Sequence, residues 1–93
     1  MVAIINLLRY DTEKAKKVIK LPLTVDTYEQ DPSNEKTTVI FDIYITPNNR
    51  WFICNELLNI LVPFTDELVI SLFEDFGKYE LVEEYFESRI QEA

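Results

Sequence analysis

Alternation of apolar and polar side chains is clearest over residues 37–46, where it predicts a long strand with one face in the core. Residues 47–50 contain a proline and two asparagines, and asparagine tolerates the left-handed backbone that tight hairpin turns require. Residues 51–54 are expected to return as the antiparallel partner strand. The apolar residues that share the core face of the first strand are Val39, Phe41, Ile43 and Ile45.

Before this hairpin, the pattern changes from apolar to mixed. Residues 2–8 are apolar and partly β-branched, which predicts a buried strand, and residues 13–20 are expected to form a short helix. Asp11 or Thr12 is placed to cap that helix, and Pro22 would end it. Residues 23–28 alternate as a strand does, and residues 30–36 are typical of a loop. The expected inward side chains of the helix are Ala15, Val18 and Ile19.

After the hairpin, the pattern acquires the helical period. Residues 57–64 are either a connection or a short strand, and Thr65 followed by two acidic residues predicts a capped helix start. Gly77 is expected to end this helix in the left-handed conformation. A second helix is predicted over residues 78–91.

Together these elements predict an α+β fold for residues 1–93, taken as a single domain. Its small antiparallel or mixed sheet would have a central hairpin, a short N-terminal helix and two C-terminal helices packed on one face. A composition that is 47% hydrophobic and 13% aromatic provides enough apolar material for a core.

Charge is distributed unevenly along the 93 residues, whose formal net charge is −8. Residues 1–22 have a net charge of +3, residues 23–65 of −4 and residues 66–93 of −7. This field disfavours nucleic acid and anionic membranes as partners and favours a protein with a basic surface. The single cysteine and the lack of a signal-peptide pattern predict a reducing compartment, the cytoplasm of a bacterial host cell.

The second predicted helix carries acidic residues at positions i, i+3, i+4 and i+7, which places them on one face. Their mean axial spacing is about 3.5 Å at a rise of about 1.5 Å per residue, close to the ~3.4 Å between phosphates of one DNA strand. The stripe is therefore a candidate nucleic-acid mimic, and the alternative is an ordinary solvated face. The four stripe residues are Glu80, Glu83, Glu84 and Glu87; Glu74 and Asp75 are expected at its edge, with Tyr79 and Tyr85 as apolar anchors.

Other chemistry is sparse in this sequence. It has no histidine, a single glycine and no glycine-rich loop for a phosphate, so we expect no enzyme activity, no metal and no cofactor. The alternative is that the carboxylates of the acidic stripe form a metal site or an acid–base pair. Cys54, in a strand without basic neighbours, is expected to be buried and inert. The aromatic residues of the hairpin are expected in the core, except Tyr44, which is a candidate for a partly exposed contact residue.

Three segments of the sequence are Tyr10-Asp11-Thr12-Glu13-Lys14-Ala15, Asn49-Arg50-Trp51-Phe52-Ile53 and Val62-Pro63-Phe64-Thr65-Asp66-Glu67. Their order and spacing are similar to those in a group of small proteins from mobile elements of Firmicutes. The sequence resembles these YDTEKA-motif proteins. Small acidic proteins of such elements include inhibitors of CRISPR effectors, so the resemblance implies an anti-CRISPR protein or a similar host-defence antagonist. It carries over no catalytic residue.

The expected function is therefore that of a stoichiometric inhibitor, which occupies a basic nucleic-acid-binding surface of an effector with its acidic helix. The alternative is a self-associating structural or regulatory module. In that case the basic N-terminal helix of one copy would meet the acidic C-terminal helix of another in a homodimer.

Overall fold

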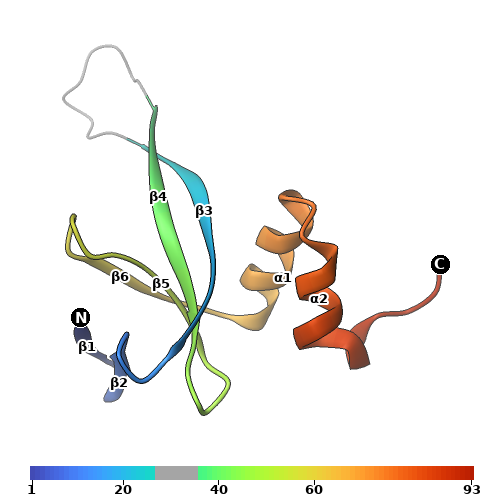
Figure 1. Ribbon diagram of the computed structural model, residues 1–93, viewed down its shortest axis with the longest axis horizontal. Helices are drawn as coiled ribbons and strands as arrows, with labels where there is room; N and C mark the ends of the chain where they lie inside the picture. Colours follow the sequence, from blue (N-terminus) through green and yellow to red (C-terminus); the bar gives the residue numbers. More distant parts are fainter. Residues whose placement is uncertain (27–35) are drawn as a thin grey trace. The chain divides into compact units, whose positions relative to one another are not determined.

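The computed structural model describes residues 1–26 and 36–93 (Figure 1). The chain divides into two compact units, Met1–Pro63 and Phe64–Ala93, and each is described by itself. Most of the loop expected at residues 30–36 lies outside the described residues, as do the last two residues of the strand expected at 23–28.

The first unit is built on an antiparallel sheet whose strand order follows the chain, β3-β4-β5-β6 (Figure 1). The predicted hairpin is confirmed: β4 pairs antiparallel with β5, and Asn49 has a φ of 61° in the turn between them. The segment of uncertain type before the helices contains a strand, β6. The strand bounds are β3 Lys16–Asp26, β4 Lys36–Ile45, β5 Trp51–Asn55 and β6 Ile60–Phe64.

The prediction of a short helix at residues 13–20 is wrong, because residues 1–26 contain only strands and turns. Its capping signal does form a turn: the Glu13 amide donates to Asp11 Oδ1 at 2.9 Å. The chain then enters β3, where the β-branched Val18 and Ile19 suit a strand and ten register pairs with β4 outweigh the helical pattern. Pro22, expected to stop the helix, is tolerated because β3 is an edge strand.

Residues 2–8 form no buried strand either. They form a hairpin of β1 (Val2–Ile5) and β2 (Leu8–Asp11), a two-stranded sheet of its own. The turn between them places Asn6 and Leu7 at φ values of 51° and 65°. Such a pair of left-handed residues matches the twist of a hairpin, but it reverses the chain before a long strand can form. Val2 and Ile4 consequently remain 57% and 63% exposed.

An aromatic cluster joins this hairpin to the larger sheet. Tyr10 of β2 meets the ring of Phe52 edge-on at 5.6 Å, and Tyr44 stacks on the same ring at 5.0 Å. Cys54 is buried in the same cluster, as predicted. The expectation that Tyr44 is partly exposed is wrong: it is only 6% exposed, because its ring is covered where the hairpin packs on the sheet.

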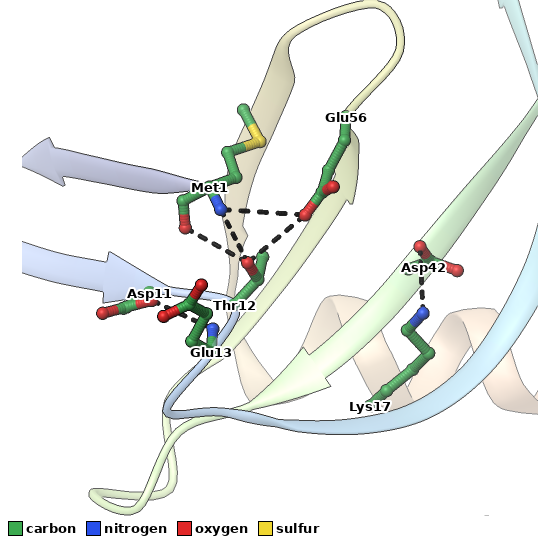
Figure 2. Close-up of polar contacts among 7 residues, drawn as sticks. All are labelled: Met1, Asp11, Thr12, Glu13, Lys17, Asp42 and Glu56. Carbon is green, nitrogen blue, oxygen red and sulfur yellow. Dashed lines mark hydrogen bonds and ion pairs between the residues drawn. The ribbon is translucent and has the colours of Figure 1, made fainter.

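A polar clamp joins the first residue of the chain to Thr12 and to Glu56, the residue after β5 (Figure 2). The amino group of Met1 donates to Thr12 Oγ1 at 2.9 Å and lies 3.8 Å from Glu56 Oε1. Thr12 Oγ1 also contacts Glu56 Oε1 at 3.3 Å. This clamp fixes the strand-to-turn junction that the capping pattern marks in the sequence.

The second unit is a helical hairpin of α1 (Asp66–Asp75) and α2 (Tyr79–Phe86), followed by a short 3₁₀ turn, η1 (Glu87–Arg89). Thr65 caps α1 as predicted, since its Oγ1 accepts from the Leu68 amide at 3.2 Å. Gly77 ends α1 with a φ of 66°. The amides of Gly77 and Lys78 donate to Glu74 O and Phe73 O at 3.0 and 2.8 Å, which is a Schellman motif.

The expected fold class therefore needs correction. Six strands in two antiparallel sheets dominate the described residues, and the helices are the two short C-terminal ones. The second of these is shorter than expected, because the backbone of Phe86 leaves the helical region with a φ of −133°. No helix in the described ranges has the length and apolar content needed to cross a membrane.

Candidate functional site

The strongest candidate site is a groove in the helical hairpin. Its floor is apolar and comes from both helices and from the residue after η1, because the i, i+3 and i+4 positions of α1 and α2 face one another. The groove has a volume of about 480 Å³. Its apolar lining consists of Ile70, Val82, Phe86 and Ile90.

Acidic residues from both helices line the same groove. Glu74 lies in the last turn of α1 and Glu83 lies in the middle of α2. Tyr79, which is 63% exposed, adds an aromatic ring with a polar tip. An apolar floor bordered by carboxylates is complementary to a segment that carries lysine or arginine beside apolar side chains.

The sequence-predicted stripe is only partly brought to this groove. Of its four members, Glu83 lines the groove, whereas Glu80 and Glu84 lie on α2 outside the lining. Glu87 belongs to η1, so the regular helical spacing ends before it. Asp75 and Tyr85 are also outside the lining. The structure thus divides the predicted residues into a groove set, Glu74, Tyr79 and Glu83, and an outer set, Asp75, Glu80, Glu84, Tyr85 and Glu87.

Arg89 also lines the groove, and its role was not recognised from the sequence. Its guanidinium lies 3.2 Å from Glu67 Oε1 and 3.9 Å from Asp66 Oδ2, both in the first turn of α1. A hydrogen bond from the helix backbone, followed by the Arg89 guanidinium, holds the pKa of Glu67 below its ordinary value. The groove lining thus contains two glutamates and one arginine, and the arginine is paired with two acids of α1.

The helical unit is strongly acidic as a whole. Residues 64–93 hold nine acidic against two basic residues, a net charge of −7, whereas residues 1–63 have a net charge of −1. Among the described residues, no three metal-ligating side chains converge in a way that would hold an ion.

The basic residues of the N-terminal region are placed differently from the expectation. A bulge at Val18 puts Lys17 and Lys20 on one face of β3, since the pairs Lys17↔Tyr44 and Lys20↔Asp42 flank it. Their ammonium groups lie 3.6 and 3.7 Å from Asp42 (Figure 2 shows the Lys17 pair). Asp42 first, and the Tyr44 hydroxyl second, raise the pKa of Lys17. The basic helix on which the self-association alternative depends is absent from residues 1–26.

No family model, curated protein or solved structure matches this chain.

Proposed function

We propose that this chain is a protein-binding module, which occupies a basic surface of a partner with the groove of its helical hairpin. The observation that carries the proposal is the combination of an apolar floor with glutamates from both helices in one groove. Apolar contact supplies affinity, and the surrounding charge supplies orientation and a fast encounter. An acidic surface without the apolar floor would attract a basic partner electrostatically but would not define a binding site.

The two sets of predicted residues have different tasks in this proposal. Glu74, Tyr79 and Glu83 contact the partner directly, and the outer glutamates raise its local concentration through their field. The partner element is a helix or extended segment that presents one or two large apolar side chains flanked by lysine or arginine. Nucleic-acid-handling proteins have basic surfaces of this kind, and a rigid acidic hairpin would compete there with the phosphate backbone.

The resemblance to small proteins of mobile elements supports a host-defence effector as the partner, with a CRISPR effector as the first one to test. Binding of this kind is stoichiometric and inhibits by occupation of the effector's surface. The proposal therefore predicts a complex of defined composition and no turnover.

A charge-matched pair of variants tests the proposal. Glu74→Gln/Glu83→Gln removes the two carboxylates that line the groove, and Glu80→Gln/Glu84→Gln removes two that do not. Tagged wild-type protein and both variants are used to capture proteins from the lysate of a CRISPR-bearing Gram-positive host, at low and high salt, with identification by mass spectrometry.

We expect one basic protein that is retained by the wild type at low salt, lost at high salt, and lost from the groove variant far more than from the outer variant. Equal loss of the captured protein from both variants would contradict binding in the groove and would indicate only a general electrostatic attraction. Retention that does not depend on salt or on either variant would contradict the proposal altogether.

A further inference from the structure

A second pocket, in the first unit, has the opposite charge to the helical groove. It is lined by β2 with the turns on either side of it and by the turn between β4 and β5. Its volume is about 340 Å³, which lies in the range typical of small-molecule sites. The apolar part of its lining comes from Leu7, Leu8, Tyr10, Ala15 and Pro47.

Three cationic side chains from three separate segments line this basic pocket: Arg9 of β2, Lys14 of the following turn and Arg50 just before β5. All three are exposed, and none forms an ion pair with any residue that the structure describes. By contrast, Lys17, Lys20 and Arg89 each have an acidic partner. Three like charges in one lining repel one another, and a bound anion would relieve that repulsion.

One carboxylate, that of Asp11, also lines the pocket, which leaves the lining with an excess of positive charge. Asp11 accepts a hydrogen bond from the Glu13 amide and so has a structural task in the turn. Two of the three cations are arginines, whose planar guanidinium groups bind a carboxylate or phosphate through paired hydrogen bonds.

Leu7 provides an independent observation. It has a φ of 65°, a conformation that glycine or asparagine adopts with less strain than leucine. Its side chain is 95% exposed, so it contributes little to the core. Leu7 is therefore an exposed apolar side chain in the lining of the basic pocket, available for contact with an apolar ligand group.

We propose that the basic pocket binds a small organic anion, in which a carboxylate or phosphate is attached to an apolar body. The anionic group contacts Arg9, Lys14 and Arg50, and the apolar body contacts Leu7 and its neighbours. This site is separate from the groove of the helical hairpin, and it does not depend on the function proposed for that groove.

The test uses the full chain labelled with ¹⁵N and follows its amide resonances by NMR. The probes are 3-phenylpropionate and phenyl phosphate, with uncharged 3-phenylpropanamide as the matched neutral compound. We expect both anions to give saturable shifts at the turns that line the pocket. The neutral amide should bind at least about tenfold more weakly, since charge-assisted hydrogen bonds are lost.

Variants locate the binding. Arg9→Gln/Arg50→Gln should weaken both anions at least about tenfold, whereas Lys17→Gln/Lys20→Gln removes the same charge away from the pocket and should leave their affinity nearly unchanged. Leu7→Gly should weaken phenyl phosphate but not inorganic phosphate, because only the former has an apolar body.

Three results would overturn the proposal: no saturable shift with either anion, equal weakening by the two double variants, or equal affinity for the neutral amide. A fourth arm titrates a synthetic peptide of residues 79–89. Binding of that acidic peptide to the basic pocket, with no binding of the small anions, would also overturn the proposal and identify the pocket as a contact between copies of the chain.

Discussion

Gly77 controls the geometry of the helical hairpin, and its replacement gives a sharp test of the structure. Its φ is +66°, and a methyl group added there would meet no atom within 4 Å. The cost of Gly77→Ala is therefore that of the backbone alone. A left-handed conformation costs a residue other than glycine about 1–2 kcal/mol, and alanine recovers about 0.4–1 kcal/mol by restricting the unfolded chain.

We expect Gly77→Ala to lower the free energy of unfolding of the helical unit by about 1 kcal/mol. Urea titration followed by far-ultraviolet circular dichroism measures this change. Gly77→Asn is the matched control, because asparagine enters the left-handed region more readily and should lose less. If alanine were as stable as glycine, or if asparagine and alanine were equally destabilised, the left-handed turn between α1 and α2 would be refuted.

Three further predictions concern stability. Leu7→Gly creates the asparagine–glycine pair preferred in such hairpin turns, so the free energy of unfolding should stay level or rise by up to about 1 kcal/mol. Calorimetry measures this change, and a fall in the free energy of unfolding would show that Leu7 packs in the core. Phe52→Ala should lower the free energy of unfolding, measured by denaturant titration, by about 3–5 kcal/mol, because Phe52 is fully buried. Phe76→Ala, at a residue that is 37% exposed, should lower it much less. Similar losses for the two variants would contradict the aromatic cluster. The pKa of Glu67 is lowered in the folded state, so its stabilising effect is present above the ordinary glutamate pKa of about 4.3 and is lost as the pH falls through the lower folded value. Thermal melts of the wild type should therefore fall more steeply below about pH 5 than those of Glu67→Gln, and parallel curves would contradict the contact with Arg89.

Strong local signals in the sequence correctly predicted individual turns, caps and strands, although the expected fold class was wrong. The alternation in β4, the asparagine turn, the Thr65 cap and the Gly77 stop each depend on the chemistry of a few neighbouring residues. The prediction of a helix at residues 13–20 was wrong, because the capping signal there is real but covers only one turn. Beyond it, the choice between helix and strand was made by pairing with β4, a partner distant in the sequence.

The site could be predicted only in part for a similar reason. Helical spacing correctly brought Glu80, Glu83 and Glu84 onto α2, but it cannot show which of them faces α1. That depends on how the two helices meet, and the turn at Gly77 decides it. The basic pocket had no sequence signal, because Arg9, Lys14 and Arg50 come together only when β2 and the turn after it lie beside the β4–β5 turn.

The most direct test of the proposed function is the affinity of the helical groove for a defined basic ligand. A fluorescent amphipathic helical peptide with leucines on one face and flanking lysines serves as the probe, and anisotropy is recorded at low and high salt. We predict saturable binding that is weakened by salt and by Glu74→Gln/Glu83→Gln, and much less by Glu80→Gln/Glu84→Gln. Equal weakening by the two variants, or equal binding of a peptide with the same composition in scrambled order, would contradict the groove as the partner-binding site.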